Sequence, residues 1–303
     1  MVYHNLVLEG GGVKGIAYAG AIKALHEKGA LKDIKAISGA SAGAIASLAL
    51  ACGYHVFEFQ KLITEMNFSY FRDDSIGMVR DLYRLFTKYG IYKGDVLTSF
   101  IVSILEDVGL DEKTTFKDLQ YLAANVKSER VYRELFVTAT NISKKRLEVF
   151  SAYTTPLMPV AMAVRMSSNI PLFWPAIEWG GDLYVDGGML CNYPMFVFDQ
   201  GINGSRKPSP DTFGLGLGNK NDVPDPETTC PPEIKSLTGY ITVLLDLLID
   251  KSNEQHVKQL DWGRTIYIPT GTVSAMDFGL SDTVIQELQD NGYKAVMESS
   301  LLK

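Results

Sequence analysis

The sequence is short of the residues that mark several classes of protein. Its 303 residues include three cysteines and four histidines. The cysteines, Cys52, Cys191 and Cys230, are odd in number and widely spaced, so they form neither a disulfide framework nor a metal-ligand pattern. We therefore expect no disulfide scaffold, no metal and no cofactor.

Basic residues are in the minority. The chain has 29 Lys and Arg against 35 Asp and Glu, a formal net charge of -6, and a pI near 5.3. No basic stripe overrides this total, so nucleic acid is not an expected partner, and anionic membranes exert no general attraction. The remaining composition, 46% hydrophobic and 21% charged, is that of an ordinary globular protein.

The N-terminus lacks the features of a signal peptide, because residues 1–9 lead directly into a predicted strand. We expect a cytoplasmic protein. Export without a cleaved signal peptide stays open as an alternative. No repeat or low-complexity tract divides the chain, so we expect one domain over residues 1–303. Residues 220–235, rich in Pro, Thr and acids, are expected to form a mobile surface loop.

What the sequence does have is an uncharged run over residues 36–57. It predicts a short strand, a tight turn and an apolar helix, and its centre, Gly39-Ala40-Ser41-Ala42-Gly43, matches the Gly-x-Ser-x-Gly pattern of a nucleophile elbow. The glycines allow the sharp turn, and the helix N-terminus would aim its N–H groups at a developing oxyanion. The run is also long enough to span a membrane, but its glycines and serines favour a buried parallel sheet.

A second glycine-rich loop, GGGVKG at residues 10–15, joins a predicted strand to a predicted helix. Gly10, Gly12 and Gly15 fit the dinucleotide pattern Gly-x-Gly-x-x-Gly, with Asp33 as a candidate ribose-binding acid. However, Asp33 precedes the next predicted strand instead of ending it. The alternative is half of an oxyanion hole for the elbow serine.

A serine nucleophile needs a base, and the histidines are poorly placed. His4 starts the first strand, His26 lies near the end of a helix, and His55 follows the elbow helix at its far end. His256 would complete the order Ser, Asp, His of an α/β-hydrolase triad, although its polar surroundings favour a solvated surface position.

Asp186 is the simpler candidate base. It follows a predicted strand at residues 182–185 and precedes Gly187 and Gly188. A rigidly held carboxylate beside a hydroxyl can take its proton during attack. Because strand ends gather at one edge of an open parallel sheet, we expect Ser41, the glycine loop and Asp186 to converge there.

The rest of the chain predicts further helices and strands. We expect helices at residues 93–108, 116–125, 156–168 and 237–260, and strands at residues 134–139, 147–151 and 265–268. Ser281 would cap a final helix, with Gly292 as a candidate interruption. The aromatic-rich residues 58–90 pack in the core or form a lid that faces lipid.

Three motifs in this order resemble the patatin-like phospholipase family: the loop GGGVKG, the elbow Gly39–Gly43, and Asp186-Gly187-Gly188. Lesser similarities are found at residues 115–119, at residues 167–171, at Asn192 and Pro194, and at residues 277–293. One departure is Ser167, where the family pattern has alanine.

The resemblance implies a three-layer α/β/α domain with a mostly parallel central sheet and a Ser41–Asp186 dyad. It also implies calcium-independent hydrolysis of acyl esters in phospholipids, lysophospholipids or neutral lipids, with peripheral membrane contact and a protein partner that activates the enzyme as further expectations. Lys14 would either satisfy loop carbonyls or add positive potential near a phosphate. The implied oxyanion-hole residues are Gly10, Gly11, Gly12, Gly15 and Ala42.

Other functions stay open at this point. A thioesterase or acyltransferase would use the same dyad. A nucleotide-binding module would use the glycine loop but leave Ser41 and Asp186 unexplained. A scaffold or effector would bind membrane or protein through residues 57–89.

Overall fold

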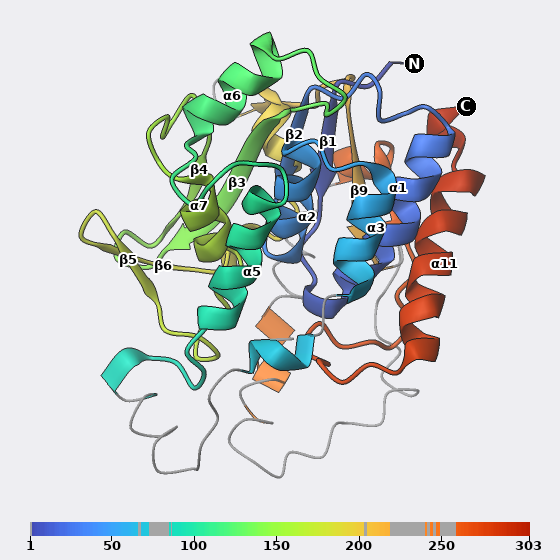
Figure 1. Cartoon of the computed structure of the whole chain (residues 1–303). Helices are drawn as coiled ribbons and strands as arrows, with labels where there is room; N and C mark the ends of the chain where they lie inside the picture. The colour runs from blue at the N-terminus through green and yellow to red at the C-terminus, as the bar shows by residue number, and fades with distance from the viewer. Residues whose placement is uncertain are drawn as a thin grey trace.

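The protein is built around a mixed β-sheet with helices packed against it (Figure 1). The computed structural model describes residues 2–65, 68–72, 85, 87–202, 205–218, 240, 243–244, 247–248 and 259–303. The 8-stranded sheet has the order β10-β9-β1-β2-β3-β6-β5, with β4 also paired to β3. The parallel strands, in sheet order, are β10 (Thr265–Ile268), β9 (Thr212–Leu217), β1 (Asn5–Leu8), β2 (Ala36–Gly39) and β3 (Glu134–Asn141).

The other strands of the sheet are antiparallel to their neighbours. β4 (Arg146–Phe150) and β6 (Asp182–Val185) each pair with β3, and β5 (Ile177–Trp179) pairs with β6. A separate hairpin is formed by β7 (Gln200–Ile202) and β8 (Ser205–Lys207). The expected α/β class with a mostly parallel central sheet is confirmed.

Both faces of β1 are buried, as its continuous apolar sequence requires. Leu6 and Leu8 join the main core beneath the helices, whereas Val7 packs with Tyr193 and Met195 on the other face. The cover on that face is therefore the turn before η3 (Met195–Phe198) and η3 itself. The strand ends between two packed layers, which fixes where the loop after it emerges.

The helices that position the site lie on the face of the sheet that carries Leu6 and Leu8. α2 (Ala42–Ala51) packs on β1, β2 and β3, while α7 (Val160–Ser167) packs on β3 and on α5 (Asp95–Glu106). The 3-10 helix η1 (Gly12–Ala17) leads into α1 (Tyr18–Glu27), which lies between α3 (Val56–Glu65) and α11 (Asp282–Glu298). The remaining helical elements are α6 (Phe116–Asn125), α8 (Gly188–Cys191), α10 (Gln259–Trp262), η2 (Phe68–Phe71) and η4 (Ser300–Leu302).

Most of the expected elements are present. The hairpin β3–β4, the helices α5 and α6, the strand β10 and the Ser281 cap, whose Oγ accepts from the Val284 amide, are confirmed. Helix α7 is shorter than expected, because it begins only after Pro159. The expected loop at residues 220–235, most of the helix at residues 237–260, and His256 lie outside the described residues.

The expected strand, tight turn and helix of the apolar run at residues 36–57 are confirmed, and the alternative of a membrane span is not, because the run divides into β2, the elbow and α2 before α3 begins. Within the described part of the chain, no helix combines the length and the apolar character needed to cross a bilayer. Gly292 does not interrupt α11; a Cβ there would lie 2.0 Å from the Ala17 carbonyl oxygen, so this glycine permits close packing on η1.

Candidate active site

Ser41 occupies a sharp turn between β2 and α2. Its backbone φ of 52° lies in the left-handed region that a non-glycine residue seldom adopts. The turn also needs its flanking glycines: a Cβ on Gly39 would lie 2.3 Å from the Gly43 carbonyl oxygen, and one on Gly43 would lie 2.3 Å from that of Leu8. This strained and crowded geometry is that of a nucleophile elbow.

The Ser41 hydroxyl donates a hydrogen bond to Asp186, with 2.7 Å between Oγ and Oδ2. The other carboxylate oxygen, Oδ1, accepts from the Gly188 amide at 2.7 Å. Asp186 is 2% exposed. Burial raises the pKa of its carboxyl to about 7, against the opposing effect of the bonds from Ser41 and Gly188. A carboxyl with such a pKa is suited to accept a proton near neutral pH.

Asp186 reaches Ser41 by a route that differs from the expected one. β3 continues beyond the end of β2, since Gly39 pairs with Val137 and β3 ends only at Asn141. β6 then runs back along this extension, antiparallel to β3, and ends at Val185 beside Thr140. The convergence is as expected, but it arises from an antiparallel strand that returns toward the elbow.

The segment after α7 ties the two residues together. The Ser41 amide donates to Ser167 Oγ at 3.0 Å, and the Ser168 hydroxyl donates to the Ser41 carbonyl at 3.2 Å. The Asp186 amide donates to the carbonyl of Asn169 at 2.9 Å. In the sequence, residues 167–171 are only a lesser similarity to the family, and no contact with Ser41 or Asp186 is expected of them.

The glycine loop lies beside Ser41. Gly12 has φ 53°, and a Cβ there would lie 1.9 Å from the Ala275 carbonyl oxygen, so the position requires glycine. Among the described residues, no acceptor faces the amide N–H groups of Gly11, Gly12 and Ala42. Gly12, Ala42 and Ser41 line the same cavity of about 40 Å³. The N–H groups of Gly12 and Ala42, which border this cavity, are therefore placed where they could donate to the carbonyl oxygen of an ester bound beside Ser41.

The other predicted residues of the loop support its shape. The Gly10 amide donates to the Asn192 carbonyl at 2.8 Å, and Asn192 Nδ2 donates back to the Gly10 carbonyl at 2.7 Å. Gly15 faces Ala42, where an added Cβ would lie 3.2 Å from the Ala42 Cβ. The Lys14 amide donates to the Gly11 carbonyl at 3.1 Å, and its side chain is half-buried. Gly10 therefore anchors the loop to the turn after Asp186.

The two glycines after Asp186 are needed for different contacts. A Cβ on Gly187 would lie 2.3 Å from the Thr138 carbonyl oxygen, and one on Gly188 would lie 2.6 Å from Asn192 Oδ1. The Gly187 amide also donates to the Ser167 carbonyl at 3.1 Å. The pair therefore lets the turn that carries the base press against β3 and Asn192.

The described histidines make no contact with this site. His26 and His55 are exposed, and Nδ1 of His4 lies 3.9 Å from Asp211 Oδ2. The described ranges also contain no group of three His, Cys, Asp or Glu side chains placed to hold a metal ion. The place that a dinucleotide-binding acid would take, at the end of β2, is occupied by the elbow, whereas Asp33 precedes this strand.

Comparisons with known proteins agree with this geometry. An uncharacterized protein of Acanthamoeba polyphaga mimivirus is 31% identical over 299 residues, which cover 97% of this chain and 92% of that protein. A probable lipid hydrolase of Invertebrate iridescent virus 6 is 27% identical over 212 residues, covering 69% of this chain and 68% of the viral protein. The crystal structure of VipD from Legionella pneumophila shares the fold, with a TM-score of 0.63 and 21% identity, over 100% of this chain and 67% of VipD.

The match to a family model is consistent with the site. Residues 6–199, which contain the glycine loop, the elbow and Asp186, match the model of patatin-like phospholipases. With its relatives and its fold taken together, the chain belongs to the patatin-like phospholipase family, a family of lipid hydrolases.

Proposed function

We propose that the protein cleaves fatty-acyl esters of phospholipids or lysophospholipids through a Ser41–Asp186 dyad, without calcium. The observation that carries the proposal is the 2.7 Å hydrogen bond from the Ser41 hydroxyl to the buried Asp186 carboxylate. The bond joins a nucleophile to a base without a histidine between them. Its surroundings exclude water, which makes the carboxylate more basic.

The first step is attack by Ser41. As its Oγ bonds to the ester carbonyl carbon, its proton passes to Asp186 Oδ2. The carbonyl oxygen becomes an oxyanion, which the N–H groups of Gly11, Gly12 and Ala42 would stabilise. Collapse of this intermediate breaks the bond to the alcohol, which takes the proton from Asp186 and leaves the acyl group on Ser41.

The second step releases the fatty acid. Asp186, ionised again, takes a proton from water as the water oxygen attacks the acyl-enzyme. The second oxyanion forms at the same N–H groups, and its collapse returns the proton to Ser41 Oγ. The cycle returns Ser41 to its hydroxyl and Asp186 to its carboxylate, so every proton is accounted for and the proposal uses no metal or cofactor.

The walls of the site support a lipid substrate. The cavity beside Ser41 is lined mainly by apolar side chains from several elements: Ile45, Ile63, Leu97, Ile170, Trp174 and Phe278. Aromatic side chains also project from the segment that begins at α3, where Phe57 is 77% exposed and Tyr70 is 68% exposed. We propose that this segment contacts the membrane surface, with the protein otherwise cytoplasmic.

Fatty-acid release from phospholipid vesicles in excess chelator tests the proposal. Ser41→Ala and Asp186→Asn should each lower the rate by about 10³-fold or more. Asp182→Asn is the matched control, because Asp182 lies at the other end of β6 in a surface ion pair with Lys144.

Two results would contradict the dyad. Equal loss in His256→Ala would indicate a triad, and full activity in Asp186→Asn would remove the base. Acyl transfer to an added thiol or alcohol in place of fatty-acid release would identify an acyltransferase on the same residues. Activity that appears only on addition of cell extract would indicate an activating protein.

A further inference from the structure

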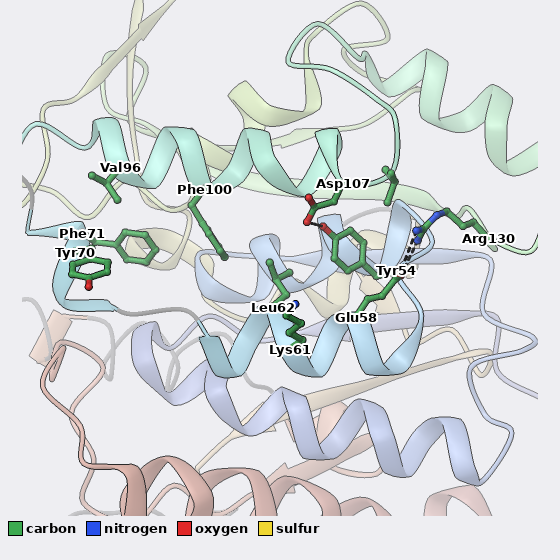
Figure 2. Close-up of a pocket in the computed structure, with 11 residues that line it drawn as sticks. Tyr54, Glu58, Lys61, Leu62, Tyr70, Phe71, Val96, Phe100, Asp107 and Arg130 are labelled. Carbon is green, nitrogen blue, oxygen red and sulfur yellow. Dashed lines mark hydrogen bonds and ion pairs between the residues drawn. The ribbon is translucent and has the colours of Figure 1, made fainter.

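A groove of about 500 Å³ lies between α3 and α5 (Figure 2). It shares the lining residue Phe71 with the cavity beside Ser41. Its two ends differ in chemistry. The polar end holds Tyr54, Glu58, Asp107 and Arg130. The other lining residues are Lys61 of α3 and a set of apolar and aromatic side chains: Leu62, Tyr70, Phe71, Val96, Phe100 and Val108.

The apolar end of the groove adjoins the Ser41 cavity through Phe71, which borders both spaces. Neighbouring residues of α5 also face the two sides, with Val96 in the groove and Leu97 in the cavity. The Phe71 ring lies 5.7 Å from that of Phe100, and its carbonyl accepts from Trp174 Nε1 at 3.2 Å. The backbone of Phe71 is thus fixed by a hydrogen bond, while Phe71 itself lies between the groove and the Ser41 cavity.

The volumes of the two spaces differ by an order of magnitude. The cavity beside Ser41, at about 40 Å³, has room for little more than a water molecule. Ligand pockets commonly measure about 300–1,000 Å³, a range that includes the groove. A fatty-acyl chain attached at Ser41 therefore needs more room than the cavity gives, and the groove is an adjacent apolar space of sufficient size.

The length of the groove sets a limit on the chain. The helical rise places Val96 and Asp107 roughly 16 Å apart along the axis of α5. An extended hydrocarbon advances roughly 1.25 Å per bond, given carbon–carbon bonds of about 1.5 Å. About 13 carbons would therefore reach from the apolar end to the polar end.

The groups at the polar end of the groove are paired with one another. Glu58 pairs with Arg130 at 2.8 Å, and the Tyr54 hydroxyl donates to Asp107 Oδ2 at 2.9 Å. These acidic side chains are matched in number by the basic side chains of Arg130 and Lys61, so the groove has no net charge that would select an ionic ligand. Its occupant is better matched by a neutral chain.

We propose that an acyl chain of the substrate runs from Ser41 past a displaced Phe71 side chain into the α3–α5 groove. This inference rests on the proposed lipid hydrolysis and adds the place of the chain and a dependence on its length. Phe71 then has to leave its present position when a long chain binds, whereas a short ester reacts with Phe71 in place.

Tryptophan substitutions that fill the groove test the proposal. Val96→Trp from α5 and Leu62→Trp from α3 enter it from opposite walls, so one of them serves if the other fails to fold. Each should lower the ratio of kcat/KM for 4-nitrophenyl hexadecanoate to that for 4-nitrophenyl butanoate by about tenfold or more. Val108→Trp lies near the polar end of the groove. It should lower kcat/KM for the hexadecanoate ester relative to the butanoate ester, but it should not lower kcat/KM for the decanoate ester relative to the butanoate ester.

The matched control is Ser99→Trp, which places the same side chain on the exposed surface of α5 outside the groove. Its ratio should equal that of the wild type. A measurement without turnover uses Ser41→Ala, in which fluorescence titration with cis-parinaric acid should show weaker binding after Val96→Trp is added. Circular dichroism confirms that each variant is folded.

The outcomes separate the two proposals. Suppose that the wild type hydrolyses all three esters and that Ser41→Ala abolishes this activity. If folded Val96→Trp and Leu62→Trp then keep the wild-type ratio of kcat/KM for hexadecanoate to that for butanoate, the proposed acyl hydrolysis is supported and the groove proposal is overturned. If no ester is hydrolysed in a Ser41-dependent manner and parinaric acid does not bind, the proposed function fails and the groove proposal fails with it.

Discussion

Replacing Asp186 with asparagine is expected to abolish hydrolysis and to stabilise the fold above neutral pH. The carboxyl is buried, and its pKa is raised from 3.8 to about 7 in the folded protein. A raised pKa means that the folded state holds this proton more tightly than the unfolded chain does. The stability that the protonated group contributes is present below pH 4 and is lost as the pH rises through 7.

The shift sets the size of the effect. A change of one pKa unit corresponds to about 1.4 kcal/mol, so ionised Asp186 costs the folded protein up to about 4 kcal/mol at pH 8. Part of this cost is already present at pH 5, where the unfolded carboxyl is ionised. The stability advantage of Asp186→Asn over the wild type should therefore grow by about 3 kcal/mol between pH 5 and pH 8.

Urea denaturation of both proteins at pH 5, 6, 7 and 8, followed by circular dichroism, measures this difference. Asp199→Asn is a control with the opposite sign. Burial of Asp199 acts to raise its pKa, but the bonds from Arg264 and Ser209 outweigh it and the pKa is lowered. Its replacement should destabilise the fold at pH 8. A stability difference between Asp186→Asn and the wild type that does not change with pH would refute a raised pKa, and with it the argument that burial makes Asp186 a base at neutral pH.

Three further results are expected. For a soluble ester, log kcat/KM should rise with a slope of one up to about pH 7 and then level off, because only ionised Asp186 accepts the Ser41 proton; a profile without this rise would contradict the assignment. Ser167→Ala removes the acceptor of the buried Ser41 amide, so it should lower the free energy of unfolding by about 1–3 kcal/mol in urea denaturation. It should also lower kcat while changing KM little, and an unchanged kcat would show that the bond is purely structural. Arg264→Met removes one of the two guanidinium groups that pair with the buried carboxylates of Asp199 and Asp261 and leaves Arg206 as their remaining arginine partner, so it should lower the free energy of unfolding by about 3–5 kcal/mol at pH 7. A loss below about 1 kcal/mol would show that Arg206 alone is sufficient for both carboxylates.

The parts of the site that depend on local chain geometry were predictable from sequence. A glycine two residues on either side of Ser41 is a requirement of one tight turn, so Gly39 and Gly43 are informative without knowledge of the fold. The same holds for the glycine loop and for the turn after Asp186. The proximity of Ser41 and Asp186 was expected from these local signals and from their order in the chain, and the hydrogen bond between them confirms it.

Features set by contacts distant in sequence were not predictable. The central strand β9, of sequence TFGLGL, was missed because two glycines weaken its strand pattern. The structure gives the reason for one of them, since a Cβ on Gly214 would lie 2.0 Å from Tyr193 Oη. The bonds that Ser167 and Asn169 accept from the Ser41 and Asp186 amides were also missed, because these residues are brought together only by the folded sheet.

The two bonds between Gly10 and Asn192 have a consequence for motion in the site. Asn192 follows Asp186 by a few residues. Its carbonyl accepts a hydrogen bond from the Gly10 amide, and its side-chain amide donates one to the Gly10 carbonyl. Asp186 and the glycine loop at residues 10–15 are thus linked through Asn192, so we expect thermal motion of one to be accompanied by motion of the other. Amide hydrogen exchange at Gly10 and Gly188 should consequently slow together when a covalent inhibitor occupies Ser41, and the spacing between proton acceptor and anion donors is kept while the surrounding loops move.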